Sequence, residues 1–550
     1  MRLWFEHTVT RRRALSVIAL TASASLLAAC SGNAPPAAST APTSASGPVS
    51  SAPANTAATV SGSRSTEGTP AQPKAGGTLR ALSTQDLAPI DGHYHHPGNG
   101  LSSWTVYEPL ITYDDDLKPQ PLLAETWDQS SDAKQIAITL RKGVQFHNGR
   151  EVTSDDVIYN LNRILDPKIS AGIFSGFVPP ETTWTPKDKY AVVITAKQPW
   201  TNVFDFLSLF NIVNKETMEG PDAKSSAVGT GPFALQEWVA GDHATFIKNK
   251  NYWQSGRPYL DGIQLNVMKD AQSQQAQFEA GAAEFTLQPS VLDYTRLKDD
   301  SNYQGITLPN AGNFFILQPN PNTKPFDDKR ARQALNYTID RKRIVDTVLR
   351  GQSTPQDLPW AAGSAADEPA KQTFYNHDLD KAKALLNAAG LSNMSFELIH
   401  SNRDPAYPQI AQIIQADLAS IGVSMSITQM EGAGMLARMN GHQFQAYLAG
   451  DVWANFLPVT VLTSDASLNY QFNNADFHDE QYAQLVKSLS AEVEPSKQRQ
   501  LYAQINDFLL DQSFEIPIAT SPTRALAVAN LRGVGHRRND FYTFTDAWLA

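Results

Sequence analysis

The stretch that decides the fold of this chain is Leu140-Arg141-Lys142-Gly143-Val144-Gln145-Phe146-His147-Asn148-Gly149. Just before it, residues 135–140 alternate apolar and polar side chains, which predicts a half-buried β-strand. Asn148-Gly149 is a strong turn signal, because both residue types tolerate a left-handed backbone. Thr153 is a favoured N-cap residue, so a helix is expected from there through Leu165. The region is therefore expected to form a strand, a tight turn and a helix in succession.

A second region repeats the order of strand and helix. Residues 395–400 have a strand pattern, residues 406–421 carry apolar side chains at helical spacing, and residues 423–429 return to a strand pattern. Gly422 is expected to stop the helix. A strand, a helix and a strand with short links predict a right-handed parallel crossover, so we expect an α/β body. Further helices are expected at residues 327–349, 379–389, 480–491 and 496–511.

Length and composition limit the classes to which this chain can belong. With 550 residues it is too long for one compact domain, and a hydrophobic content of 41% is enough for folded cores. Its one cysteine cannot form a disulfide within the chain, and it excludes cysteine-rich zinc or iron–sulfur sites. A formal net charge of −10 argues against a nucleic-acid-binding surface.

The N-terminus has the parts of an export signal, which we place at residues 1–29. Thr10-Arg11-Arg12-Arg13 is basic, and residues 14–29 are uncharged, mostly apolar and too short for a comfortable membrane span. They end in Leu27-Ala28-Ala29-Cys30, which resembles the bacterial lipobox, so Cys30 is expected to be acylated. A plain signal peptide with a chance cysteine is the alternative. The paired arginines leave the general and the twin-arginine export routes open.

Residues 30–73 are expected to be the lipidated cysteine and a disordered tether. They are almost all Ala, Ser, Thr, Pro and Gly, and only Arg64 and Glu67 are charged. Such a segment cannot bury enough apolar area to offset the entropy of ordering. Its length gives an end-to-end distance of roughly 35–40 Å, which suits a module anchored to a membrane by acyl chains. A glycosylated stalk would serve the same mechanical purpose.

The order of motifs in the rest of the chain is similar to that of one protein family. Leu122-Leu123-Ala124-Glu125-Thr126-Trp127 followed by the stretch 140–149 resembles the most specific signature of the extracytoplasmic solute-binding proteins of ABC importers, in the family with oligopeptide-, dipeptide- and nickel-binding members. Further motifs follow the family order: Gly76-Gly77-Thr78-Leu79-Arg80, Tyr107-Glu108-Pro109-Leu110, Thr153-Ser154-Asp155-Asp156-Val157, Gly229-Thr230-Gly231-Pro232-Phe233, Asn251-Tyr252-Trp253, Pro325-Phe326-Asp327-Asp328-Lys329-Arg330-Ala331-Arg332-Gln333-Ala334-Leu335 and Ala382-Lys383-Ala384-Leu385-Leu386. Most of these residues are expected to carry structure rather than to mark the site.

The resemblance implies an α/β, two-lobed periplasmic-binding-protein fold of type II, also called a Venus flytrap, with an extra domain inserted in the first lobe. Lobe I would comprise residues 74–106, 229–312 and 519–550, and the inserted domain residues 107–228. Lobe II would comprise residues 313–518. The chain would cross between the lobes more than once, so that the crossings act as a hinge over the ligand cleft.

The resemblance also implies a receptor and not an enzyme. Such a protein captures a solute, most simply a peptide, and delivers it to the permease and ATPase subunits of an ABC importer. A nickel or metal chelate, an opine or an oligosaccharide are the alternative ligands. A monomer is expected, extracytoplasmic and lipid-anchored to the cell membrane, either in the periplasm or at the cell surface. No cofactor and no nucleic-acid partner are expected.

Two other classes compete with an import receptor. An exported hydrolase is disfavoured because the sequence contains no Gly-x-Ser-x-Gly, no His-Glu-x-x-His and no Walker A pattern. A signalling or adhesion receptor would keep the fold and lose the coupling to transport. Two permease and two ATPase genes beside this gene would favour import.

Candidate ligand-binding residues also come from the resemblance. Peptide-binding relatives carry an acidic residue that pairs with the α-ammonium group of the peptide, and Asp451 is at the similar position. A cation in a closed cleft needs a charge partner. The alternative is that Asp451 caps a turn. Trp453 is expected to form an aromatic wall, and Arg438 and Arg403 are further candidates. Leu448 departs from the tryptophan that is frequent in the oligopeptide pattern.

A histidine-rich loop is the second candidate region, Asp91-Gly92-His93-Tyr94-His95-His96-Pro97-Gly98-Asn99. In relatives the matching loop offers backbone groups to an extended ligand, so His95, His96 and Asn99 are candidates for ligand contact. The histidines could instead bind a metal or a metal chelate. The remaining alternative is an exposed loop without contact to the ligand.

Overall fold

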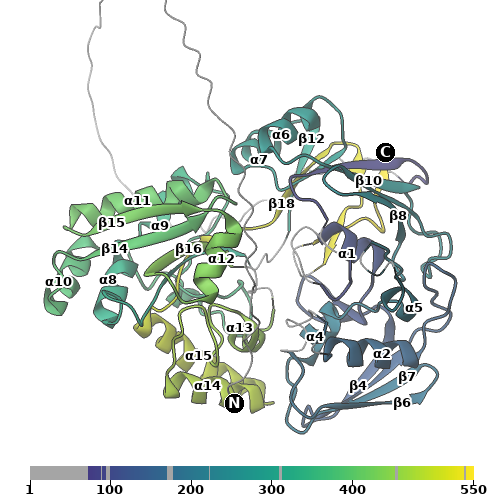
Figure 1. Cartoon of the computed structure of the whole chain (residues 1–550), viewed down its shortest axis with the longest axis horizontal. Coiled ribbons are helices and arrows are strands. Elements are labelled where there is room, and N and C mark those ends of the chain that lie inside the picture. Colours follow the sequence, from purple (N-terminus) through teal and green to yellow (C-terminus); the bar gives the residue numbers. More distant parts are fainter. Residues whose placement is uncertain are drawn as a thin grey trace, which may run out of the picture. The chain divides into compact units, whose positions relative to one another are not determined.

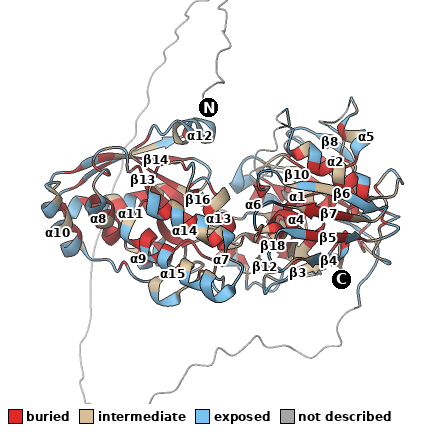
Figure 2. Ribbon diagram, turned by 90° about the horizontal axis from the view of Figure 1, so that it is seen from below, coloured by how far each residue is buried: buried red, intermediate tan, exposed pale blue. Residues whose placement is uncertain are grey.

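The computed structural model describes residues 72–550, apart from residues 88–89, 95–99, 167, 170–176, 222, 224, 309–312, 452–455 and 538–540. The predicted signal peptide, Cys30 and nearly all of the predicted tether lie outside the described residues. Figure 1 labels the helices and strands. Figure 2 shows buried residues along the strands and exposed residues on the outer turns of the surrounding helices.

The stretch 140–149 folds as its sequence predicts. Strand β5 (Gln135–Leu140) ends where the stretch begins, and the Gly149 N–H donates a hydrogen bond of 2.8 Å to the Phe146 carbonyl. Gly149 has a φ of +85°, in the left-handed region that favours glycine. Helix α2 (Ser154–Ile164) begins after its N-cap Thr153, which forms a capping box with Asp156. The predicted strand, turn and helix are confirmed.

Strand β5 belongs to an antiparallel sheet of four strands in the order β4-β5-β7-β6. The other strands are β4 (Ala124–Gln129), β6 (Thr183–Asp188) and β7 (Ala191–Thr195). Around it lie β2 (Ile111–Tyr113), β3 (Pro119–Pro121), α4 (Val203–Leu209) and α5 (Lys215–Met218). We call these elements, together with α2, the insert body.

A sheet of seven strands, in the order β12-β18-β11-β1-β10-β9-β8, forms the second body. Its strands are β1 (Thr78–Ser83), β8 (Phe233–Val239), β9 (His243–Lys248), β10 (Gly262–Val267), β11 (Phe285–Leu287), β12 (Tyr303–Thr307) and β18 (Arg524–Val528). Its helices are α1 (Gly100–Val106), α6 (Ala271–Glu279) and α7 (Val291–Leu297). Two small antiparallel pairs join β19 (Leu531–Arg532) with β22 (Trp548–Leu549) and β20 (Gly535–Arg537) with β21 (Phe541–Thr543). This seven-stranded body therefore unites segments from both ends of the described chain.

The third body is built on a sheet of five strands in the order β15-β14-β16-β13-β17. The strands are β13 (Phe314–Pro319), β14 (Ser395–Ser401), β15 (Ser424–Met430), β16 (Ala446–Asp451) and β17 (Ile516–Thr520). Strands β14 and β15 are parallel and are joined by α11 (Ala406–Ser420), so the predicted crossover is confirmed. The other helices of this five-stranded body are α8 (Lys329–Thr338), α9 (Arg341–Thr347), η2 (Pro369–Lys371), α10 (Leu379–Ala389), α12 (Gly432–Asn440), α13 (Pro458–Ser464), α14 (Glu480–Ala491) and α15 (Pro495–Gln512).

One predicted helix is wrong in its extent. The helix expected over residues 327–349 is two helices, α8 and α9, which meet at Ile339 and Asp340. Ile339 has an extended backbone, with ψ of 111°, and the Asp340 side chain accepts a hydrogen bond of 2.9 Å from the Arg343 N–H. Aspartate at an N-cap competes with a continuous helix, so the apolar spacing predicted the helical face but not the break.

The family motifs meet one another in space. The Gly231 N–H donates a hydrogen bond of 2.9 Å to the Val106 carbonyl, and a Cβ on Gly229 would lie 2.1 Å from that carbonyl oxygen. His147, from the stretch 140–149, donates hydrogen bonds to the carbonyls of Gly229 and Gly231. The buried Glu108 accepts hydrogen bonds from Thr230 Oγ1, Tyr252 Oη and Trp253 Nε1 at 2.8, 2.8 and 3.1 Å. These contacts support the prediction that the motif residues carry structure.

The chain passes twice between the seven-stranded and five-stranded bodies, from β12 to β13 and from β17 to β18. The two passages lie side by side, because Asn313 Nδ2 donates a hydrogen bond of 3.0 Å to Thr523 Oγ1. In the part of the chain that the structure describes, no helix combines the length and the apolar character needed to cross a membrane.

Candidate ligand-binding site

Asp451 is the last residue of β16 and lies opposite Phe314 of β13. Only 8% of the residue is exposed, and Ser467 Oγ donates a hydrogen bond of 3.0 Å to its Oδ2 atom. The preceding Gly450 N–H donates a hydrogen bond of 2.8 Å to Tyr407 Oη. The apolar residues of β16 are buried in the core, and Asp451 is the only charged residue of this strand. Its carboxylate therefore lies at the end of the strand.

Two further carboxyl groups lie beside Asp451. Asp465 follows α13 and Glu515 precedes β17, and they are 2% and 5% exposed. The Ser467 N–H donates to Asp465 Oδ1, so Ser467 contacts two of the three groups. Within the described residues, no hydrogen bond reaches Asp465 Oδ2 or either carboxyl oxygen of Glu515. We call Asp451, Asp465 and Glu515 the carboxyl cluster.

The carboxyl cluster has an unusual electrostatic environment. Burial raises the pKa of Asp465 well above its usual range, and the charge of Asp451 raises this pKa further. Burial and Asp451 also raise the pKa of Glu515. Tyr447 and Tyr482 lie near these groups, but their hydroxyls donate to Gln318 and to the Leu468 carbonyl instead. Because adjacent buried carboxylates repel each other, Asp465 and Glu515 favour their protonated forms.

The segment after Asp451 is held at its far end by another body of the molecule. Residues 452–455, which include the predicted Trp453, lie outside the described residues. At Leu457 the backbone N–H donates a hydrogen bond of 2.8 Å to Asp205 Oδ2, on helix α4 of the insert body. Thr460 Oγ1 donates to the same carboxylate oxygen at 2.6 Å. Asp451 before this gap and Leu457 after it are therefore each held by hydrogen bonds.

Arg403 and Arg438, the two predicted basic residues, occupy different surroundings. Strands β14 and β16 are parallel, and the last residues that they pair are His400 and Leu448. Arg403 follows the end of β14, and a Cβ on Gly432 would lie 3.2 Å from its Nε atom. Arg438, on α12, forms a salt bridge of 2.7 Å with Glu397 and donates a hydrogen bond of 2.7 Å to the Gln443 carbonyl. The side chain of Arg403 thus lies against the start of α12, and the guanidinium of Arg438 has partners within its own body.

The histidine-rich loop is described only at its start. His95, His96 and Asn99 lie outside the described residues. His93 is buried, with Nε2 at 3.0 Å from the Asn211 carbonyl oxygen and Nδ1 at 2.8 Å from Arg163 Nη1. Burial lowers the pKa of His93 to about 4, so the ring is neutral, with Nε2 donating and Nδ1 accepting. Both ring nitrogens are thus engaged, and His93 fixes the start of the loop.

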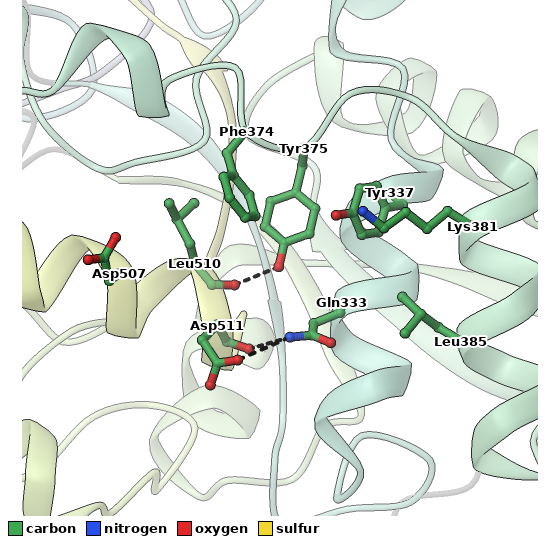
Figure 3. Close-up of a pocket in the computed structure, with 9 residues that line it drawn as sticks. All are labelled: Gln333, Tyr337, Phe374, Tyr375, Lys381, Leu385, Asp507, Leu510 and Asp511. Carbon is green, nitrogen blue, oxygen red and sulfur yellow. Dashed lines mark hydrogen bonds between the residues drawn. The ribbon is translucent and has the colours of Figure 1, made fainter.

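A separate pocket of about 210 Å³ lies in the five-stranded body between α8, α10 and α15 (Figure 3). It is lined by Gln333, Tyr337, Phe374, Tyr375, Lys381, Leu385, Asp507, Leu510 and Asp511. Its charged groups are already paired, because Asp507 binds Lys371, Asp511 binds Lys329, and the Lys381 ammonium lies 4.2 Å from the centre of the Tyr337 ring. This pocket lies apart from Asp451 and offers no unpaired charge to a ligand.

No trio of His, Cys, Asp or Glu in the described ranges has the arrangement of a metal site. Three residues that matter here were missed by the sequence reasoning: Asp205, Asp465 and Glu515. A sequence signal existed for two of them. Asp205 interrupts the apolar run Val203-Phe204-Asp205-Phe206-Leu207, and Glu515 stands between Phe514 and Ile516. A charged residue within a buried apolar run needs a specific partner or a shifted pKa.

The sequence matches the family described as bacterial extracellular solute-binding proteins, family 5, over residues 118–472. The chain belongs to this family. Family 5 proteins are substrate-binding proteins of ABC importers that act outside the cytoplasm, so the predicted family and the prediction of a receptor class are confirmed at this level.

Several known proteins are similar to this family 5 chain. Heme-binding protein A of Haemophilus influenzae is 29% identical over 464 residues, which are 76% of this chain and 82% of the relative. Glutathione-binding protein GsiB of Salmonella typhimurium is 27% identical over 465 residues, 81% of this chain and 89% of the relative. The oligopeptide-binding protein AppA from Bacillus subtilis, solved with a nonapeptide, gives a TM-score of 0.75 at 22% identity and covers 87% of this chain and 100% of AppA. The last similarity confirms the predicted two-lobed fold.

Proposed function

We propose that this protein captures a solute with a free ammonium group, most simply a peptide, and delivers it to an ABC permease. The observation that carries the proposal is the carboxyl cluster at the end of β16. Asp451 is proposed as the acid that pairs with the ammonium group, and Asp465 and Glu515 beside it are buried with carboxyl oxygens that receive no hydrogen bond within the described residues. A buried carboxylate at Asp451, beside two carboxyl groups whose protonated forms are favoured, suits a cationic ligand group and disfavours an anion.

Two known proteins support a peptide-type ligand. GsiB is named for glutathione, a short peptide with a free ammonium group, and AppA was solved with a nonapeptide. Arg403, which follows β14, is proposed to face the carboxylate end of such a ligand. Trp453, His95, His96 and Asn99 are proposed as wall and loop contacts, and Arg438 as an outer contact.

A metal chelate is the second candidate ligand, and one observation favours it. Heme-binding protein A is similar to this chain over 76% of its length. A chelate of this kind would use the aromatic and histidine side chains of the two loops more than the ammonium position of Asp451. A peptide would therefore depend on the Asp451 carboxylate for binding, whereas a metal chelate would not.

The same proposal includes the architecture and the anchor. Lobe I (74–106, 229–312 and 519–550) corresponds to the seven-stranded body, residues 107–228 to the insert body, and lobe II (313–518) to the five-stranded body. Cys30 would carry the acyl chains and residues 30–73 would form the tether. The separation of the seven-, four- and five-stranded sheets supports this grouping, although β17 of the five-stranded sheet runs to Thr520, two residues past the proposed end of lobe II.

Identifying the bound solute tests the proposed function most directly. Native mass spectrometry of the purified protein, followed by denaturation and analysis of the released small molecules, should yield peptides. Thermal-shift measurements with free peptides, sugars and Ni²⁺ follow, since a ligand at about 100 Kd stabilises by roughly 2.7 kcal/mol. Release of a metal chelate with no response to peptides would replace the first candidate by the second.

A further inference from the structure

Asp205 joins two bodies that share no sheet. It lies on α4 in the insert body, where Tyr113 Oη donates a hydrogen bond of 3.0 Å to its Oδ1 atom. Its Oδ2 atom accepts from the Leu457 N–H at 2.8 Å and from Thr460 Oγ1 at 2.6 Å, both in the five-stranded body. The carboxylate therefore takes donors from both bodies.

Neighbouring groups complete the contact. Asn202, the N-cap residue of α4, donates a hydrogen bond of 2.9 Å from Nδ2 to Thr460 Oγ1. The Thr460 hydroxyl thus donates to Asp205 and accepts from Asn202. The ring of Phe177 lies 6.3 Å from the ring of Phe456, edge to face, and the buried apolar residues of the two bodies form one continuous cluster. This is a packed interface and not a single chance hydrogen bond.

The burial of Asp205 is explained only when the two bodies are joined. The residue is fully buried within an apolar helix, where an ionised carboxylate is costly unless donors satisfy it. Two donors come from the five-stranded body and would be lost if that body moved away. The chain passages between bodies, from β12 to β13 and from β17 to β18, are separate from this contact. Rotation about these passages would open the contact.

We propose that Asp205 is a positioning residue that latches the insert body to the five-stranded body in the closed molecule. The latch comprises Asp205 and Asn202 on one side and Leu457 and Thr460 on the other. Leu457 and Thr460 follow Asp451 closely in the chain, so the latch joins the insert body to the part of the five-stranded body that carries the candidate ligand-binding acid. The purpose of the latch rests on the proposed function, but its existence can be measured without any ligand.

Pairs of spin labels measure the separation of the bodies. In full-length protein with Cys30→Ser, labels are attached at Lys187→Cys on β6 and Leu436→Cys on α12, both of which are exposed. Asp205→Ala should raise the population at long distances about tenfold relative to the unsubstituted latch, because hydrogen bonds to a charged group are among the stronger ones. Thr460→Val, which keeps the shape of the side chain, should shift the distances in the same direction by a smaller amount.

Tyr113→Phe is the matched control. It removes a donor to the same carboxylate from within the insert body, so it should leave the distance distribution unchanged. Thermal melting by circular dichroism shows which variants fold. If Asp205→Ala does not fold, the distance distribution of Thr460→Val tests the latch instead. Distances in Asp205→Ala and Thr460→Val equal to those in Tyr113→Phe would overturn the latch. If the variants show the latch but the released-solute analysis and the thermal-shift screen find no solute, the proposed function is contradicted and the latch stands. If a solute is found but the variants leave the distances unchanged, only the latch is contradicted.

Discussion

At the scale of single residues, buried carboxyl groups differ in what satisfies them. Glu108 accepts hydrogen bonds from three side chains of the family motifs, and the buried Arg537 guanidinium opposes the rise that burial causes in its pKa. Glu515 receives no hydrogen bond at its carboxyl oxygens within the described residues. A satisfied buried acid stabilises a fold, whereas an unsatisfied one costs stability and marks a site for another role.

Asp451→Ala should weaken the binding of free-amino peptides far more than that of N-acetylated peptides. Removal of one partner of a buried charge pair costs about 2–5 kcal/mol of binding free energy. An N-acetylated peptide has no ammonium group and makes no ion pair with Asp451, so its affinity should change little. Isothermal titration calorimetry with matched peptide pairs measures both affinities. Equal losses for both peptides would remove the ammonium role from Asp451.

Asp465→Asn should stabilise the protein at neutral pH and have less effect in acid. Burial and Asp451 raise the pKa of Asp465 in the folded state above its value of about 3.9 in the unfolded chain. The folded state therefore holds the proton more tightly, so this residue contributes stability below the unfolded pKa and that contribution is lost as pH rises. Asparagine keeps the oxygen that accepts the Ser467 N–H and carries no charge.

Urea unfolding of wild type and Asp465→Asn from pH 4 to pH 8 measures this difference. The gain in the free energy of unfolding should grow with pH to roughly 1–3 kcal/mol, the usual cost of an unsatisfied buried polar group. The exposed Asp116→Asn serves as a control and should show no such trend. A gain that is constant with pH, or a loss at pH 8, would contradict a buried and mostly protonated Asp465.

At the scale of elements, some backbone segments pack so closely that only certain residue types fit between them. Gly229 passes against the Val106 carbonyl with no room for a Cβ atom, and the Thr230 hydroxyl next to it donates to Glu108. Helices α8 and α9 separate at Asp340, although their apolar faces continue one pattern. Elements here are positioned by contacts with other elements as much as by their own sequence.

Gly229→Ala should be far more destabilising than Gly149→Ala. A Cβ at Gly229 would meet the Val106 carbonyl at 2.1 Å, and a backbone atom cannot give way as a side chain can. Gly149 has open space around it, so alanine there costs only the strain of a positive φ, about 1 kcal/mol. Thermal melting of both purified variants compares them. Similar melting temperatures would show that segments 105–106 and 229–231 are not packed so closely.

At the scale of the whole molecule, the proposed function requires the bodies to move and the protein to stay near a permease. The seven-stranded and five-stranded bodies are joined by two chain passages, and the insert body meets the five-stranded body through Asp205. A solute can favour the closed arrangement only as far as it binds that arrangement better. The latch adds to the same equilibrium, so it should slow release of any bound solute.

Cys30→Ser should move the protein from the membrane fraction to the soluble extracytoplasmic fraction. Each buried methylene of an acyl chain contributes about 0.8 kcal/mol. Among the described residues no helix is long and apolar enough to hold the protein in the membrane instead. Metabolic labelling with a palmitate analogue, together with fractionation of the expressing cells, measures both lipid attachment and location. A Cys30→Ser protein that remains in the membrane fraction would contradict lipid anchoring.

Several local features could be predicted because they depend on neighbours in the sequence. The strand at 135–140, the turn at Gly149 and the cap at Thr153 follow from alternation, backbone freedom and hydrogen-bonding side chains. The break at Asp340 was missed because an aspartate within an apolar helical pattern can either cap a new helix or face solvent. Sequence spacing alone does not decide between these two.

The sequence by itself determined the family, the α/β class and the position of Asp451, since motif order and periodicity are properties of the chain. Only the tertiary structure decided what surrounds Asp451. Asp465 and Glu515 come from separate turns of the chain, and Asp205 comes from another body, yet all lie near the same segment. The cost of burying charge depends on which groups approach through space, and that is settled only when the sheets and helices pack.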